Sequence, residues 1–168
     1  MMILGLAWLF LIASFSWAFQ NEPEGFRDLK WGDELLSIQG MKKIGVDPSY
    51  GGMDKYIRKS DKLRIGEAKL DSIIYCFWKG KLCDVTISVK GFINWIGLKE
   101  SAFERFGEGV KNDRFGQSYS WFGNKTSMTL VYSEVSKKGI FWISSTEIFD
   151  QAERLRKEKA KEDAAKGF

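Results

Sequence analysis

The fold class is decided by the stretch DSIIYCFWKGKLCDVTISV at residues 71–89, which reads as a β-hairpin. Two runs rich in β-branched and aromatic residues flank Lys79-Gly80, a pair typical of a two-residue turn. In the second run apolar and polar residues alternate, so Cys83 shares one face with the valines and isoleucine that follow it. A two-residue turn places Cys76 directly opposite Cys83 on this core face.

The same turn assigns the other large side chains of the hairpin to the opposite face. Tyr75, Phe77 and Leu82 are expected there, together with the polar Asp84 and Thr86. A face of this kind belongs to the core only if something covers it. The C-terminal helix or the loop at residues 41–55 are the two segments that could do so.

A second hairpin follows the same plan, with strands at residues 127–133 and 140–145 around a polar turn that ends in Gly139. Its expected core face carries Met128, Leu130, Tyr132, Phe141 and Ile143. Val131 and Trp142 alternate with these residues, so we expect them on the other face.

A short helix and one more strand precede each hairpin. The expected helices start near Asp33 and near Asn94, and the extra strands cover residues 55–58 and 117–122. Corresponding features recur after about 60 residues, which indicates duplicated α-β-β-β units at about 26–90 and 91–146. The sequence therefore predicts an α+β fold, with one continuous antiparallel sheet and the helices on one face.

This order of elements resembles a known fold. The segments FRDLKWGD at residues 26–33 and IIYCFWKGKL at residues 73–82 are similar to the entry and the hairpin of the β-lactamase-inhibitor-protein-like fold, which small outer-membrane assembly lipoproteins share. The chain also resembles uncharacterised secreted bacterial proteins with a Trp-Gly entry. The resemblance implies protein binding through an uncovered sheet face, and it brings no catalytic residues. No cysteine stands at the expected cleavage point, so a lipid anchor is not implied.

The N-terminal segment predicts export. Residues 2–13, MILGLAWLFLIA, have the length and apolarity of a signal-peptide core, and Ser16-Trp17-Ala18 offers small residues where a signal peptidase needs them. We expect residues 1–18 to be cleaved, which leaves a single domain at 19–150 and a periplasmic or secreted location. The alternative is an uncleaved membrane anchor, because no Lys or Arg precedes the apolar run.

The last segment, residues 151–168, is expected to be a charged helical tail. After Arg156 the sequence reads KEKAKEDAAK, which is polar on every side of a helix. Such a helix is either solvated or an arm that binds a partner.

Composition excludes several functional classes. The chain has no histidine, two cysteines and a net charge of +4, so Ser-His-Asp triads, Cys-His pairs and zinc sites with histidine ligands are excluded. No pattern joins carboxylates or an activated serine in one cleft. We expect no enzymatic activity, no metal and no cofactor, with an envelope enzyme of unrecognised type as an alternative. Export argues against a nucleic-acid partner, and membrane contact is expected only if the N-terminal segment is not cleaved.

The two cysteines are expected to form a disulfide. Residues opposite each other on one sheet face lie within bridging distance, and export leads to an oxidising compartment. Two buried free thiols are the main alternative, and a redox-active Cys76–Cys83 pair is a further one.

The expected function is protein binding by an aromatic sheet face. Tyr75, Phe77, Leu82, Val131 and Trp142 would form a contiguous apolar patch, and such patches usually mark interfaces. The expected partner is an envelope or extracellular protein. A small-ligand or glycan carrier that uses Trp121 and Trp142 as stacking platforms is the alternative.

Overall fold

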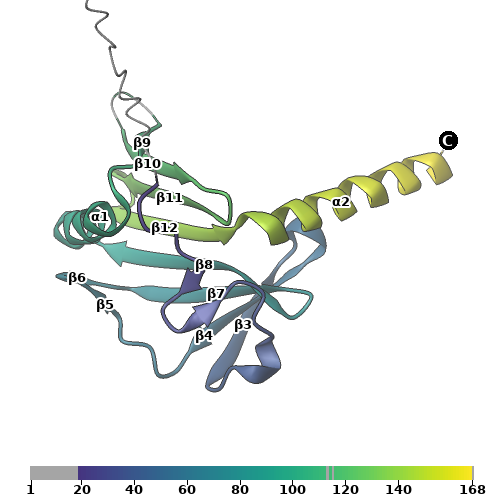
Figure 1. Ribbon diagram of the computed structural model, residues 1–168, viewed down its shortest axis with the longest axis horizontal. Helices are drawn as coiled ribbons and strands as arrows, with labels where there is room; N and C mark the ends of the chain where they lie inside the picture. The colour runs from purple at the N-terminus through teal and green to yellow at the C-terminus, as the bar shows by residue number, and fades with distance from the viewer. Residues whose placement is uncertain (1–18, 113, 115, 168) are drawn as a thin grey trace, which may run out of the picture.

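The computed structural model describes residues 19–112, 114 and 116–167, and it consists of one large antiparallel sheet and two helices (Figure 1). The predicted signal peptide and its cleavage site lie outside the described residues. The sheet order is β3-β4-β7-β8-β12-β11-β10-β9, and every neighbouring pair is antiparallel. The predicted α+β class with one continuous antiparallel sheet is therefore confirmed.

The eight strands follow the chain as two meanders. The first contains β3 (Met41–Asp47), β4 (Met53–Arg58), β7 (Ser72–Trp78) and β8 (Lys81–Lys90). The second contains β9 (Val110–Lys111), β10 (Gln117–Phe122), β11 (Thr126–Ser133) and β12 (Lys138–Ser145). They join where β8 pairs with β12. Two small ribbons complete the strands: β1 (Gly25–Phe26) with β2 (Leu29–Lys30), and β5 (Arg64–Ile65) with β6 (Ala68–Lys69).

Both predicted hairpins are present. In the first, Lys79 and Gly80 have φ values of 50° and 78°, the left-handed conformation that a tight hairpin turn with a matching twist requires. In the second, Met128 pairs with Ile143 and Leu130 with Phe141, so the predicted core face of this hairpin is correct.

Helix α1 (Phe92–Phe106) covers one face of the sheet. Trp95, Leu98 and Ala102 recur at helical spacing and are buried against the sheet. The helix ends at Gly107, as predicted, where a φ of 79° turns the chain and the Gly107 N–H donates to the Phe103 carbonyl at 2.9 Å. The main core lies between this helix and the sheet.

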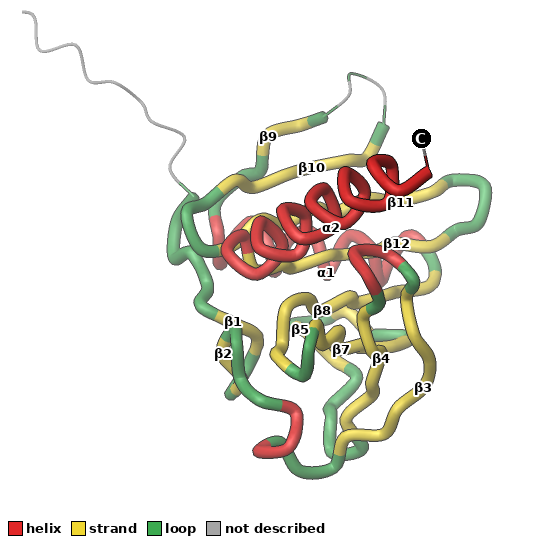
Figure 2. Tube along the Cα trace, turned by 90° about the vertical axis from the view of Figure 1, so that its right-hand side faces the viewer, coloured by secondary structure: helices red, strands yellow, loops and turns green. Residues whose placement is uncertain are grey.

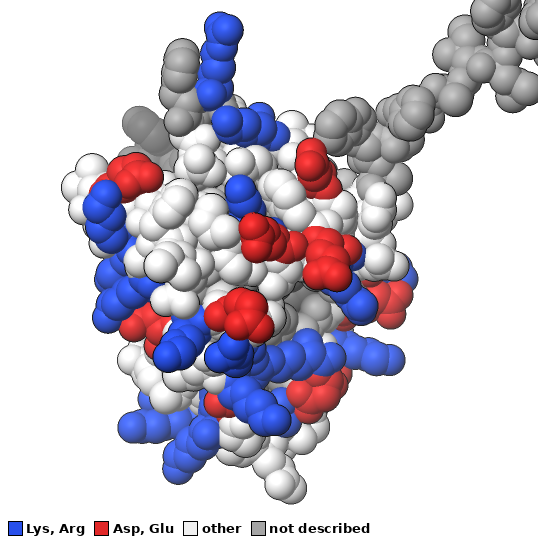
Figure 3. All heavy atoms as spheres, turned by 90° about the vertical axis from the view of Figure 1, so that its left-hand side faces the viewer, with Lys and Arg blue, Asp and Glu red and all other residues white. Residues whose placement is uncertain are grey.

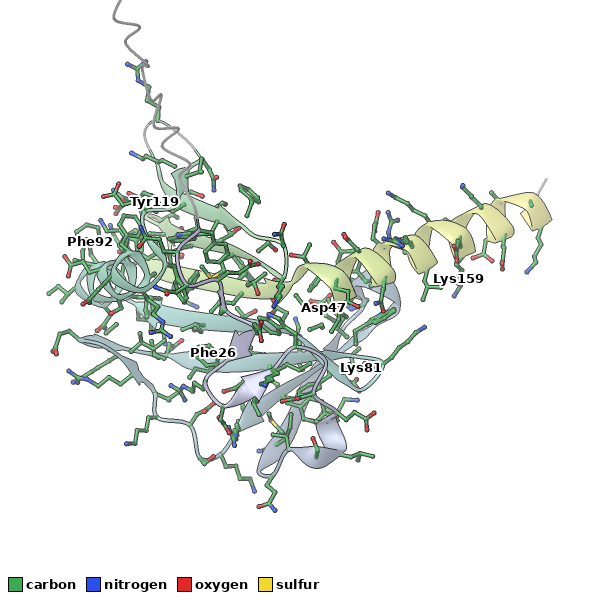
Figure 4. The ribbon with its side chains drawn as sticks, in the orientation of Figure 1. Phe26, Asp47, Lys81, Phe92, Tyr119 and Lys159 are labelled. Atoms are coloured by element: carbon green, nitrogen blue, oxygen red, sulfur yellow. The ribbon has the colours of Figure 1, made fainter. Side chains whose placement is uncertain are left out.

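Helix α2 (Thr146–Gly167) begins on the opposite face, so the two helices lie on different sides of β12 (Figure 2). Its first turns bury Ile148 and Ala152 against Cys76, Trp78 and Cys83. From residue 154 onward every described side chain is exposed, and the helix extends away from the sheet, as its residue Lys159 shows in Figure 4. The predicted charged C-terminal helix is confirmed.

The helix predicted from Asp33 towards Gly40 is wrong, because that segment forms only the 3-10 turn η1 (Leu35–Ser37). Its backbone is used by the sheet: the Gly32 N–H donates to the Leu82 carbonyl, and the Leu82 N–H donates to the Asp33 carbonyl, both at 2.9 Å. Extended pairing next to β8 thus replaces a helix too short to be stable by itself. The first meander therefore has no α-helix corresponding to α1. The expected loop at 41–55 is also wrong, since it holds β3 and the 3-10 turn η2 (Ser49–Gly51).

A β-bulge in β8 corrects the predicted faces of the first hairpin. Leu82 pairs with Phe77 and Asp84 with Cys76, so Cys83 is the extra residue in the ladder. Beyond the bulge the alternation is displaced by one residue. Leu82 and Val85 therefore lie on the same face, the one that also carries α1, whereas Cys83 and Asp84 lie on the other.

Gly139 supplies a test of the packing beneath α1. A Cβ atom at this position would lie 2.7 Å from Trp95 Cε3 and 2.7 Å from Val89 Cγ2. We expect Gly139→Ala to lower the free energy of unfolding by about 1–3 kcal/mol, the usual cost of overpacking. Gly45→Ala is the control, because nothing lies within 4 Å of a Cβ there. Urea unfolding of both variants measures the difference, and equal stabilities would contradict the packing described.

Candidate ligand-binding site

The five residues predicted to form a partner-binding patch do not share one surface. Tyr75, Phe77 and Leu82 are at most 1% exposed and belong to the main core on the α1 side of the sheet, where Phe26 contacts Tyr75 and Tyr56 contacts Phe77. Their predicted position on the open face is wrong because the bulge at Cys83 displaces the alternation of the strand. Of this set, only Val131 and Trp142 lie on the outer face, where both are partly exposed.

The stacking platforms of the alternative prediction are also separated. Trp121 is buried beneath α1, and its indole N–H donates to the Gly107 carbonyl at 2.9 Å. Trp142 lies across the sheet from this position, paired with Thr86 on one side and Thr129 on the other. The two tryptophans therefore cannot hold one ligand between them.

Cys76 and Cys83 are free thiols in this structure, and they form no disulfide. The bulge is the reason, because it places Asp84 rather than Cys83 opposite Cys76. The Cys83 thiol donates to the Cys76 carbonyl oxygen at 3.2 Å instead. Burial raises the pKa of both thiols, that of Cys83 to about 12, so both are protonated and poorly nucleophilic.

Asp84 is a buried carboxylate on the outer face of the sheet. Its two oxygens accept hydrogen bonds from Ser144 Oγ at 2.7 Å and from Thr86 Oγ1 at 3.0 Å. Burial raises the pKa of this carboxyl, and the two hydroxyl donors act in the opposite direction. The Asp84 carboxyl therefore holds its proton more tightly in the folded chain than in the unfolded chain.

The raised pKa of Asp84 gives a pH-dependent stability. In the unfolded chain this carboxyl loses its proton near pH 4, the usual aspartate pKa. In the folded chain it keeps the proton to a higher pH, so the free energy of unfolding falls as the pH rises from about 4 to the pKa of the folded state. Each unit of pKa difference corresponds to about 1.4 kcal/mol. We expect Asp84→Asn to gain stability relative to the original protein between pH 4 and pH 7. Urea unfolding at both pH values measures this change.

Asp163→Asn, on the exposed part of α2, is the matched control and should show no such change. The raised pKa would be contradicted if Asp84→Asn differed from the original protein in stability by the same amount at pH 4 and at pH 7.

A cavity of about 630 Å³ lies on the α1 side of the sheet. One wall is the segment from Phe19 to Trp31, here called the N-terminal strap, and the others are α1 and β5. Its apolar lining includes Leu29, Ile65, Leu98, Phe106, Phe141 and Ile143. Phe26, which also lines the cavity, lies on the strap near the middle of the molecule in Figure 4.

The strap is held against α1 and the start of β11. The Gln20 N–H donates to the Phe106 carbonyl at 3.1 Å. One carboxylate oxygen of Glu22 accepts the backbone N–H groups of Lys125 and Thr126 at 2.5 and 2.8 Å. The Trp31 indole N–H donates to Thr126 Oγ1 at 2.7 Å. These bonds fix the position of the strap relative to α1 and β11.

Ion pairs hold the strap on its other side. Arg27 Nη1 lies 2.6 Å from Asp61 Oδ1, and Asp61 Oδ2 accepts the Tyr75 hydroxyl at 2.9 Å. The Arg58 guanidinium makes two hydrogen bonds to Asp28, at 2.7 and 2.9 Å. Bidentate hydrogen bonds of this kind restrict the relative orientation of the two side chains as well as their distance. One side of this open cavity is therefore formed by an anchored segment rather than by a free chain end.

Sequence patterns could not have located this cavity. Its lining comes from five separate parts of the chain, near residues 21–30, 64–65, 87, 98–106 and 141–143. Each part lacks a motif of its own, and periodicity reports only which face a residue occupies, not which faces meet.

Comparison of the chain with protein-family models, curated proteins and solved structures finds no match. Within the described part of the chain, no three Cys, Asp or Glu side chains gather as a metal site would require. None of the helices described is long and apolar enough to cross a membrane.

Proposed function

We propose that this protein is a non-enzymatic carrier that binds a small, largely apolar ligand in the cavity beneath the N-terminal strap. The observation that carries the proposal is the cavity itself. Its volume of about 630 Å³ falls within the usual range for ligand sites, about 300–1,000 Å³. Buried apolar side chains such as Leu98 and Ile143 line it, and apolar atoms form most of its surface.

The anchoring of the strap supports this assignment. Apolar side chains that line an open cavity stay in contact with water, so the chain forgoes the stability that their burial would supply. Here collapse of the strap onto these side chains is opposed by the hydrogen bonds of Glu22 on one side and by the Arg27–Asp61 pair on the other. A wall that is held open at a stability cost is what a preformed ligand site requires.

The location of the carrier and its origin also remain proposals. The apolar segment at residues 2–13 favours export to the periplasm or beyond, where small apolar molecules need a carrier. The sheet order favours duplicated units, because four strands in mirrored sequence lie on each side of the junction between β8 and β12. Under this proposal the first unit has lost its helix, and the strap occupies the corresponding space. The resemblance to the β-lactamase-inhibitor-protein-like fold stays a prediction.

Filling the cavity tests the function. Ala102 lines it from α1, and Ala102→Leu places additional carbon atoms in the space that the ligand would occupy. With the neutral fluorescent probe N-phenyl-1-naphthylamine, we expect the original protein to bind and the variant to bind about tenfold more weakly, a loss of about 1.4 kcal/mol. Fluorescence titration gives both dissociation constants.

Ala160→Leu, on the exposed part of α2, is the matched control and should bind the probe normally. Thermal unfolding of both variants shows whether they remain folded. Absence of probe binding to the original protein, or equal binding by folded Ala102→Leu, would overturn the carrier proposal.

A second candidate function is protein binding on the outer face of the sheet. Val131 pairs with Ile140, and Trp142 lies two residues further along β12, so three partly exposed apolar side chains adjoin there. Apolar groups that adjoin on an uncovered sheet face favour an interface.

Trp142 tests this second candidate. We expect Trp142→Ala to lose at least about tenfold in affinity for a partner captured by the original protein, because tryptophans often dominate interface energies. Thr129→Ala, the neighbouring position on β11, is the control. Pull-down from an envelope extract, followed by titration with the captured protein, measures the change. Unaltered binding by folded Trp142→Ala would exclude this face.

A further inference from the structure

The cavity has a positively charged edge. Four cationic residues, Arg27, Lys30, Arg64 and Arg105, contribute to its lining, against the two acidic residues Glu22 and Glu24. Figure 3 faces the side of the molecule where α1, β5 and β6 lie, and it shows Lys and Arg side chains gathered in a band across this side, with acidic side chains mostly above them. The residues of the edge differ, however, in whether their charge is already paired.

Both acidic groups are engaged outside the cavity. Glu22 accepts two backbone N–H groups from the start of β11, and Glu24 forms an ion pair with Lys125. The hydrogen bond from Lys125 holds the pKa of Glu24 below its usual value, so this carboxylate stays ionised beside its partner. Glu24 also interacts electrostatically with Lys30, but more weakly than with Lys125, and among the described residues neither carboxylate forms an ion pair with a cation of the edge.

Two of the four cations are engaged in the same way. Arg27 pairs with Asp61 and also donates to the Lys62 carbonyl, and Arg64 pairs with Glu67. Their guanidinium groups stabilise the walls of the cavity, so they have less capacity left for a ligand.

Lys30 and Arg105 differ from these, because within the described residues neither side chain has a hydrogen bond or an ion pair. They come from opposite walls, Lys30 from the strap and Arg105 from the last turn of α1. Asn21 holds the Arg105 backbone in place by donating to its carbonyl at 2.9 Å. An apolar cavity thus has two unpaired cations at its edge.

We propose that the ligand of this cavity is an amphiphilic anion, an acyl chain that ends in a carboxylate or a phosphate. This inference rests on the proposed carrier function. The acyl chain occupies the apolar floor, and the head group lies between Arg105 and Lys30. A guanidinium offers paired N–H donors that match both carboxylate and phosphate oxygens, and an ammonium adds a second charge.

Displacement of N-phenyl-1-naphthylamine tests the inference with three probes of equal chain length, namely dodecanoate, dodecyl phosphate and dodecanol. We expect both anions to displace the fluorophore at concentrations at least about tenfold lower than dodecanol does. The double variant Arg105→Gln/Lys30→Gln should lose this preference and bind dodecanol as before. Gln retains most of the length of each side chain, and the Arg105 carbonyl bond to Asn21 involves only the backbone.

The control is Lys159→Gln/Lys161→Gln on the exposed part of α2, which removes the same net charge far from the cavity. It should keep the preference for anions. Preference for only one anion supports the inference and identifies the head group. Equal binding of anions and dodecanol, or an anion preference that survives in Arg105→Gln/Lys30→Gln, overturns the inference and leaves the carrier function standing. Failure of the original protein to bind either the fluorophore or any chain overturns both.

Discussion

The extra residue in β8 determines which side chains of the central hairpin become core. Because Cys83 and Asp84 together oppose Cys76, Leu82 and Val85 both lie on the α1 side of the sheet. The aromatic side chains of β7 on that face, Tyr75 and Phe77, then complete the largest part of the core. A hairpin without the bulge would place these apolar groups on two different faces, and α1 could cover only one of them.

The same bulge accounts for the unusual polar group of the outer face. It directs Asp84 to the outer face of the sheet, where Ser144, Thr86 and the Cys76 thiol donate to its carboxylate. It also separates the two cysteines in the ladder. One local irregularity therefore links core composition, a buried carboxylate and two protonated thiols.

The cavity is a consequence of how little of the sheet one helix can cover. Helix α1 has 15 residues, about 22 Å in length, whereas the sheet has eight strands. The remaining area beside α1 is covered by the strap and by β5, which contain only two-residue strands and combine a few apolar contacts with specific hydrogen bonds and ion pairs. Such a cover leaves space above the floor residues Leu98 and Ile143, and it places charged side chains at the rim.

The sequence by itself determined the α+β class, both hairpins, the end of α1 at Gly107 and the charged C-terminal helix. These features depend on local periodicity and turn residues, which act over a few positions. Only the tertiary structure decided which residues occupy each face of the first hairpin, that the segment after Asp33 forms no α-helix, and where the cavity lies. The bulge does not alter the composition of the strand, so residue patterns do not reveal it. Backbone pairing with Leu82 competes with helix formation after Asp33. The cavity is lined by segments that are distant in the chain. Each is set by contacts between segments, which residue patterns within one segment do not encode.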